Sequence, residues 1–459
     1  MEGRETSNRA DQGQSGPETD TDDNDCRVQG HRPRLSKVNL FTLLSLWMEL
    51  FPREKSEDDD SESDALQIRG MGLVVVRDSK VLGLHCSGAE LHAGQAAIIQ
   101  HGTRLADCEL YFSRRPCATC LKMIINAGVS QISFWPGDPE VSMLRSTSTT
   151  HPNSRSHSPP SGITEEAMLD TIATEKLKSN SRTHICVGMQ PMAPGLAQFV
   201  DQTSKQCDFM ERVAEDEPGI ITDELFNRHL AEFSRQFLVT KSQQHRTILT
   251  QMHLENFCVE PYFSNLRHNM KKLVEVLAAV AAGIPQQNHG FYRLKSSLNL
   301  LRRIISAETI SLFLASVAED AKVGVGAVIW ARGPSAGCDG TNGLHLVGCG
   351  YNAYPKGSQY AEYPQMDNKQ EDRQRRKYRY IVHAEQNALT FRARDIKPEE
   401  PTLLFVTKCP CDECIPLIRG AGVSHIYTTD QDRDKDKGDI SYLRFGSLKD
   451  TSKFIKSVR

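Results

Sequence analysis

Short apolar runs alternate with amphipathic segments in two parts of the chain. In the first part, the apolar run 72–78 is followed by another at 79–88, and the pair predicts a β-hairpin. A helix from about 92, a strand over 108–113 and a loop leading into a helix over 114–128 complete the pattern. This order of elements predicts an α/β unit.

The second part has the same order of elements. An apolar helix comes first, then strands and a second loop with its helix, at 309–320, 324–331, 344–357, 402–407, 408–422 and 424–430. Since strands and helices alternate in both parts, we predict two α/β domains. Each should contain a mixed or mostly parallel sheet with helices on both faces.

A leucine-rich stretch at 38–51 precedes the first part. It predicts an amphipathic helix that packs on a sheet, with a nuclear export signal as the alternative. Asn39, Ser45 and Glu49 interrupt the stretch, which is also too short to cross a bilayer, so we expect no membrane contact. The acidic, polar segment before it does not fit a secretory signal. We therefore expect a cytoplasmic or nuclear protein that is not secreted.

Polar segments suggest where the domains begin and end. Residues 1–35 are rich in Asp, Glu, Gly, Ser and Asn, and we expect them to be disordered. The Ser-, Thr- and Pro-rich segment 141–183 predicts a linker. We therefore predict a first domain over 36–140, a mostly helical connecting region over 184–308 and a second domain over 309–459.

Composition narrows the classes of protein that fit. A chain of 459 residues with 39% apolar and 25% charged residues suits a globular protein of two or three domains. The net charge of −3 gives no general attraction to nucleic acid, so we do not expect a nucleic-acid partner. Thirteen cysteines, an odd number without a secretory signal, favour metal or redox chemistry over a disulfide framework.

The two parts are copies of each other. Residues 112–132 and 406–426 align without a gap, and Pro-Cys-x-x-Cys and Ala-Gly-Val-Ser match position for position. An internal repeat of this kind indicates two domains of one fold.

The second copy carries the fuller set of chemical groups. His383, Cys411 and Cys414 supply the three protein ligands of a catalytic zinc site, which keeps its fourth position for water. Glu385 follows the histidine by two residues, so its carboxylate can reach that water without binding the metal. His-x-Glu followed by Pro-Cys-x-x-Cys is the signature of zinc-dependent nucleobase deaminases. A purely structural zinc site is the alternative, but no fourth ligand is evident.

Together with Gly-Tyr-Asn-x-x-Pro at 350–355, these motifs make residues 309–445 resemble the deoxycytidylate (dCMP) deaminase branch of the cytidine deaminase superfamily. The resemblance implies a three-layer α/β/α domain with a five-stranded sheet, zinc, and hydrolysis that releases ammonia. It also implies a homo-oligomer, and it assigns a contact with the sugar to Asn352. We predict that Ala384 binds substrate as well. In the first copy, Ser87 loosely corresponds to that asparagine.

The first copy keeps the three ligand types but lacks the carboxylate. His92, Cys117 and Cys120 match the ligand positions, so we expect a second zinc ion there. Gly94 stands where the second copy has its glutamate, and the amide of Gln95 cannot carry a proton. We therefore predict an inactive copy with a structural or oligomerising role, and a regulatory nucleotide site is the alternative.

Two classes of substrate fit such an enzyme. The first class is free deoxycytidine nucleotides, either dCMP or dCTP, or the nucleoside itself. For the nucleotides, the expected phosphate-binding groups are Lys356, Arg379 and Lys408. Single-stranded DNA or RNA is the alternative. It is disfavoured by the slightly acidic chain and by the lack of an aromatic residue in Thr-Lys-Cys-Pro-Cys, before the second cysteine pair. A scaffold without catalysis would fit the first copy, but Glu385 opposes it for the second.

Overall fold

A computed structural model describes the chain in several stretches. These are residues 35–50, 70–88, 90–139, 161–192, 196, 223–283, 324–333, 344–358, 363–364, 372–437 and 439–457. The predictions of disorder for 1–34 and of a helix over 309–320 lie outside the described residues.

A five-stranded mixed sheet forms the centre of the first domain. Its strands are β1 (Gly72–Arg77), β2 (Lys80–Cys86), β3 (Glu109–Phe112), β4 (Gln131–Phe134) and β5 (His184–Val187). They lie in the order β2-β1-β3-β4-β5. Strand β1 pairs antiparallel with β2 and β3, whereas β3, β4 and β5 run parallel. The predicted hairpin is therefore confirmed.

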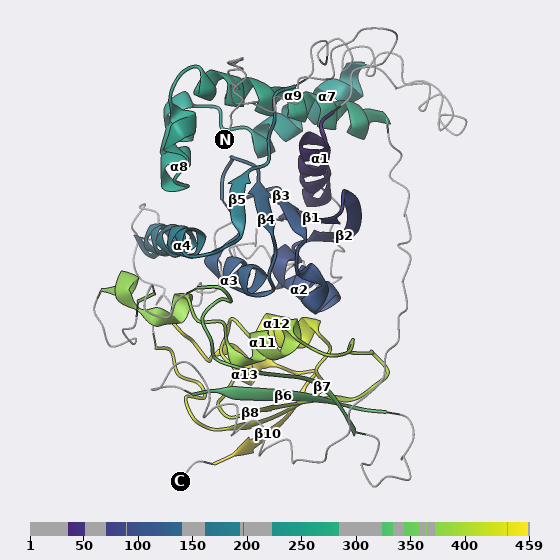
Figure 1. The fold of residues 1–459 in the computed structure, drawn as a ribbon, viewed down its shortest axis with the longest axis vertical. Helices are drawn as coiled ribbons and strands as arrows, with labels where there is room; N and C mark the ends of the chain where they lie inside the picture. The colour runs from purple at the N-terminus through teal and green to yellow at the C-terminus, as the bar shows by residue number, and fades with distance from the viewer. Residues whose placement is uncertain are drawn as a thin grey trace, which may run out of the picture.

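Helices cover both faces of this sheet. Its helices are α1 (Lys37–Glu49), α2 (Ala93–His101), the 3-10 turn η1 (Gly102–Leu105) and α3 (Ala118–Asn126). Helix α1 lies on one face and α2 with α3 on the other (Figure 1). Because side chains alternate along a strand, Val74 and Val76 pack with Phe41 of α1, whereas Leu73 and Val75 join the main core. The leucine-rich stretch thus forms the predicted sheet-packed helix.

Part of the predicted linker is regular structure of the first domain. Helix α4 (Ser161–Ser179) packs against α3. Strand β5 also belongs to this sheet, although its residues fall in the region 184–308 that was predicted to be a mostly helical connection. The linker prediction for 141–183 is therefore wrong from residue 161 onward. Leu169, Ala173 and Leu177 are spaced four residues apart and form the buried face of α4. This apolar spacing, and not the Ser- and Pro-rich composition before it, determines the local structure.

The second domain repeats the topology of the first. Its strands are β6 (Gly326–Arg332), β7 (Leu344–Tyr351), β8 (Thr402–Val406), β9 (His425–Thr429) and β10 (Ser452–Lys456), in the order β10-β9-β8-β6-β7. Its helical segments are η4 (Arg373–Arg375), η5 (Lys377–Arg379), α11 (Ala384–Thr390), α12 (Ile415–Gly420) and α13 (Arg444–Ser447). Again one strand, β6, pairs antiparallel with two neighbours, and the others run parallel. The predicted pair of five-stranded mixed α/β domains is confirmed.

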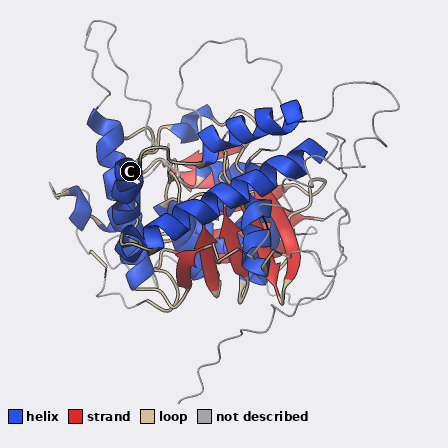
Figure 2. Ribbon diagram, turned by 90° about the horizontal axis from the view of Figure 1, so that it is seen from above, coloured by secondary structure: helices blue, strands red, loops and turns tan. Residues whose placement is uncertain are grey.

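The connecting region packs on the first domain. It contains α7 (Asp223–Phe237), α8 (Ser242–Gln251), the 3-10 turn η2 (Glu255–Cys258) and α9 (Tyr262–Gly283). Seen from above, helices lie across the strands (Figure 2). Trp135 Nε1 donates to the main-chain oxygen of Phe237 at 3.0 Å, and His245 Nε2 lies 3.0 Å from the oxygen of Pro136. Among the helices that the structure describes, none combines the length and apolar character that a membrane span requires.

Helices of the two domains meet in a layer between the two sheets. Helices α2 and α3 of the first domain face α11 and α12 of the second (Figure 1). Arg392, just after α11, donates to the main-chain oxygens of Ile98 and Ile99 in α2. The helices that follow the two histidines and the two cysteine pairs therefore lie at the contact between the domains.

A buried histidine pair in the first domain is expected to make its stability depend on pH. The Nε2 atoms of His85 and His101 lie 3.0 Å apart. Burial and the neighbouring His101 lower the pKa of His85 to about 3, and burial with Arg104 lowers the pKa of His101 to about 4. In the unfolded chain both histidines have a pKa near 6.5, so below that pH the unfolded chain binds more protons than the folded one. The free energy of unfolding therefore decreases as the pH falls from about 6.5 toward 4.

Between pH 7 and pH 5 we expect the free energy of unfolding of the first domain to fall by about 2 kcal/mol per histidine. The double variant His85→Leu/His101→Leu has neither group and should lose this part of the pH dependence. Chemical denaturation of both proteins at the two pH values measures the difference. An equal decrease in both proteins would contradict the prediction.

Candidate metal centres and active site

Three side chains of the second domain converge on one point. His383 Nδ1 lies 3.2 Å from Cys411 Sγ and 3.4 Å from Cys414 Sγ, and the two sulfur atoms are 3.8 Å apart. All three side chains are buried, and together they could hold one metal ion. The structure thus brings together the three residues that the sequence predicted as zinc ligands.

Main-chain hydrogen bonds fix the two turns that carry these side chains. His383 is the N-cap residue of α11, and its N–H donates to Gln386 Oε1 at 2.9 Å. Cys414 is the N-cap residue of α12, and its N–H donates to the main-chain oxygen of Cys411 at 2.9 Å. Pro416 is tolerated in the first turn of α12 because its missing N–H would have no partner there.

The charges of this cluster favour metal binding. Burial alone would keep the Cys411 thiol neutral, but hydrogen bonds with Cys414 and His383 lower its pKa well below the usual range. The thiolate, and not the thiol, is the form of cysteine that binds a metal. One imidazole nitrogen with two sulfur atoms is a donor set that fits zinc.

Glu385 lies in the first turn of α11, beside the three ligands and separate from them. Its side chain is only 4% exposed. Burial, and after it the charge of Cys411, raises the pKa of this carboxyl group to about 7. A carboxyl group that titrates near neutral pH can both accept and donate protons under physiological conditions.

A pocket opens onto these residues. Asn352, His383, Glu385 and Cys411 line it, together with Tyr378 and Tyr442. Neither tyrosine was expected from the sequence, because both lie outside the segment 407–411, which has no aromatic residue. Aromatic side chains in a pocket wall suit the flat face of a base. Tyrosines in the segments on either side of the motif were therefore the signal that the sequence offered.

Asn352, which was predicted to contact the sugar, is hydrogen-bonded to Ala384, which was predicted to bind substrate. Asn352 Oδ1 accepts a hydrogen bond from the main-chain N–H of Ala384 at 3.0 Å. In the first domain, Ser87 Oγ accepts from the N–H of Ala93 at 3.2 Å. The loose alignment of Ser87 with Asn352 therefore corresponds to the same structural role.

The three basic residues predicted to bind phosphate lie in different places. Lys408 lines the pocket and pairs with Asp432 at 2.6 Å. Arg379 instead directs its guanidinium to Glu166 and Asp439, at 2.7 and 3.2 Å. Lys356 is exposed and does not line the pocket. Only Lys408 is therefore retained as a candidate, because the positions of the other two depend on ion pairs and loop geometry that the motif does not reveal.

The first domain has a matching cluster. Cys117 Sγ and Cys120 Sγ lie 3.3 and 3.5 Å from His92 Nδ1, and all three side chains are buried and could hold a second metal ion. Gln95 accepts from the N–H of His92 at 3.1 Å, as Gln386 does in the second domain. The conformation of this turn is thus preserved in the copy that lacks the glutamate.

Gly94 packs tightly against the ligand-bearing helix. A Cβ atom built on this glycine would lie 3.0 Å from Cys120 Cβ, 3.1 Å from its Sγ and 3.1 Å from Ile124 Cδ1. These contacts are closer than ordinary van der Waals distances. The packing of the first domain around this position therefore leaves little room for a side chain.

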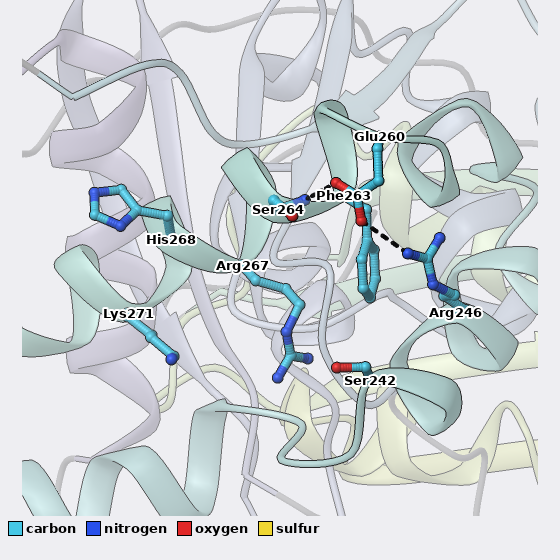
Figure 3. A pocket seen from close by; sticks show the side chains of 8 residues that line it. All are labelled: Ser242, Arg246, Glu260, Phe263, Ser264, Arg267, His268 and Lys271. Atoms are coloured by element: carbon cyan, nitrogen blue, oxygen red, sulfur yellow. Dashed lines mark hydrogen bonds and ion pairs between the residues drawn. The ribbon is translucent and has the colours of Figure 1, made fainter.

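A larger cavity of about 330 Å³ lies in the connecting region, between α8 and α9 (Figure 3). Arg246, Arg267 and Lys271 give it a basic lining. Arg246 pairs with Glu260 at 2.9 Å and lies over the ring of Phe263. No cysteine and none of the three-residue metal clusters of the described chain line it, so its chemistry differs from that of the two centres.

Comparison with known proteins agrees with this arrangement. Residues 54–135 and 307–429 match the family described as the cytidine and deoxycytidylate deaminase zinc-binding region. The chain is 55% identical to the cytidine and dCMP deaminase domain-containing protein 1 of Danio rerio, over 95% of this chain and 92% of that protein. The chain therefore belongs to the cytidine and deoxycytidylate deaminase family, and zinc is the metal that its two His-Cys-Cys clusters fit.

Two further similarities cover a smaller part of the chain. Human deoxycytidylate deaminase is 33% identical over 102 residues, which are 22% of this chain and 55% of that protein. The structure of the dCMP deaminase from the cyanophage S-TIM5, in complex with dCMP and dUMP, aligns with 33% of this chain and 93% of its own, at 23% identity and a TM-score of 0.23.

Proposed function

We propose that the second domain is a zinc-dependent deaminase that converts the cytosine of free deoxycytidine nucleotides to uracil, and that the first domain does not catalyse. The supporting observation is the position of Glu385, a buried carboxyl group in a pocket with His383 and Cys411. The first domain has the equivalent histidine and cysteines, but Gly94 at the position of the glutamate.

The side chains of the second site divide the reaction between them. His383, Cys411 and Cys414 would hold a zinc ion, which when bound supplies a water molecule with a pKa near neutrality. Glu385 accepts a proton from the attacking water and passes it to N3 of the cytosine. The oxygen of that water bonds to C4, and Glu385 then transfers the proton of the resulting hydroxyl group to the amino nitrogen. The C4–N bond breaks, the nitrogen leaves as ammonia, and the oxygen becomes the uracil carbonyl.

The remaining walls of the pocket hold the rest of the substrate. Tyr378 and Tyr442 offer flat apolar surfaces for the base. Asn352 takes the sugar, in an orientation set by the N–H of Ala384. Lys408 is the cation in the pocket wall, and it would exchange Asp432 for a phosphate group of the nucleotide.

A panel of substrates tests this proposal. The full-length protein is incubated with cytidine, dCMP, dCTP, CTP and a cytosine-containing single-stranded DNA, and the uracil product of each is measured. We expect turnover of dCMP or dCTP and little product from the DNA. Product from the DNA alone would favour the polynucleotide alternative, and no product from any compound would refute a deaminase.

A glutamate restored in the first domain is expected to leave that domain inactive. In Gly94→Glu the new Cβ atom would lie 3.0 to 3.1 Å from atoms of Cys120 and Ile124, so these neighbours would have to shift, and Ser87 would still stand in place of the asparagine. The double variant Gly94→Glu/Glu385→Ala should therefore show no turnover above that of Glu385→Ala alone. Substantial turnover of a deoxycytidine nucleotide by the double variant would mean that the first pocket binds substrate.

A further inference from the structure

One helix of the first domain reaches into the metal-binding turn of the second. Lys122 on α3 donates to Glu413 Oε2 at 2.8 Å. Glu413 lies between Cys411 and Cys414, in the turn that carries both sulfur ligands. The lysine side chain is 0% exposed and that of the glutamate 19%. This is a buried ion pair that joins residues almost 300 positions apart in the sequence.

One turn further along α3, a second side chain contacts two more segments of the same site. Asn126 Nδ2 donates to Asn387 Oδ1 at 2.6 Å, on the helix that begins at His383. Asn126 Oδ1 accepts from the main-chain N–H of Lys356 at 3.0 Å, four residues after Asn352. Residues four apart lie on one face of a helix. One face of α3 therefore touches the cysteine turn, the histidine helix and the asparagine loop.

The second domain does not carry the side chains for the equivalent contacts. In the gap-free alignment of the two repeats, Lys122 corresponds to Pro416 and Asn126 to Gly420, neither of which has a polar side chain. Glu413 corresponds to Thr119, which has no charge. The second domain contacts α2 through Arg392, but the positions of α12 that match Lys122 and Asn126 offer no polar side chain to the cysteine turn of the first domain. This asymmetry matches that of Glu385, which only the second domain carries.

We infer that Lys122 and Asn126 of the first domain are positioning residues for the active site of the second, holding its cysteine turn, histidine helix and asparagine loop in register. The inference rests on the function proposed for the second domain. It gives the domain without a catalytic glutamate a defined role in the reaction. Outer groups that orient metal ligands typically contribute about tenfold to a hundredfold to metal affinity or activity.

The ion pair is tested with the full-length protein and a double-mutant cycle. Lys122→Met, Glu413→Gln and the variant with both changes are compared for kcat, for KM and for the rate of zinc release to a chelator. Cys411→Ser identifies the phase of release that belongs to the second centre. We expect each single change to lower kcat and to accelerate that phase by about tenfold to a hundredfold, with little change in KM. The double variant should be no worse than the worse single variant.

A control separates positioning from general destabilisation. Arg114→Met breaks another buried ion pair, Arg114–Glu49, that lies away from the second domain. Its kcat per folded molecule should stay at the wild-type value. Effects of Lys122→Met and Glu413→Gln that multiply, or an equal loss of kcat in Arg114→Met, would overturn the inference. If the wild-type protein deaminates nothing, the proposed function fails, while zinc release still decides the role of Lys122.

Asn126 provides a second test, which does not require Lys122→Met to fold. Asn126→Ala removes only a neutral amide. We expect a KM about tenfold higher, since the lost hydrogen bonds hold the loop that carries Asn352. Wild-type values of KM, kcat and zinc release in Asn126→Ala would overturn the inference for this residue.

Discussion

Replacing Glu385 with alanine is expected to abolish deamination and to leave the zinc content and the fold intact. The carboxyl group lies in the pocket beside the metal cluster but is not part of it. A positioned acid–base group contributes about 10²-fold to 10⁴-fold to the rate, and in the proposed reaction Glu385 serves two proton transfers. We therefore expect a loss at or beyond the upper end of that range.

The measurement combines activity with metal analysis of the purified variant. Glu400→Gln provides a matched control, because Glu400 is also a buried glutamate of the second domain but pairs with Arg394 and Lys397. That control should keep its activity. Loss of zinc together with activity in Glu385→Ala would show that the residue is structural and that the proposed proton transfers are wrong.

Serine at Cys411 or Cys414 is expected to remove both the metal and the activity of the second domain. A hydroxyl oxygen is a much poorer zinc ligand than a thiolate. Each of these sulfur atoms lies within 3.4 Å of His383 Nδ1, so the loss of one leaves only two ligands. Because the described residues contain two His-Cys-Cys clusters, zinc should fall from two ions per chain to one.

Cys349→Ser is the control for this pair of variants, since Cys349 is an exposed thiol on β7. It should retain two zinc ions and full activity. Wild-type turnover by Cys411→Ser or Cys414→Ser would exclude a zinc hydrolase in the second domain. A loss of all zinc in either variant would instead mean that the first cluster depends on the second.

Much of the fold could be predicted because its signals are local. Short apolar runs indicated the strands from β1 to β4 and from β6 to β9, because a strand that is buried on both faces is apolar at successive positions. The edge strands β5 and β10 and the helix α4 were missed. β10 is rich in polar residues, and α4 directly follows a segment of linker-like composition.

The sequence by itself determined the chemical groups. His383, Cys411, Cys414 and Glu385 could be named because metal ligation and proton transfer require particular side chains at particular spacings. The same reasoning found the glycine that replaces the glutamate in the first copy. Such motifs lie within short segments whose local conformation is set by their own residues.

Only the tertiary structure decided which side chains surround those groups. The pairing of Arg379 with Glu166, and of Lys122 with Glu413, joins residues more than 200 positions apart. A charged residue near a motif has many possible partners, and the spacing along the chain does not select among them. The packing of α3 and α4 against the second domain makes that selection, because an ion pair forms only where the fold brings two opposite charges within a few ångströms.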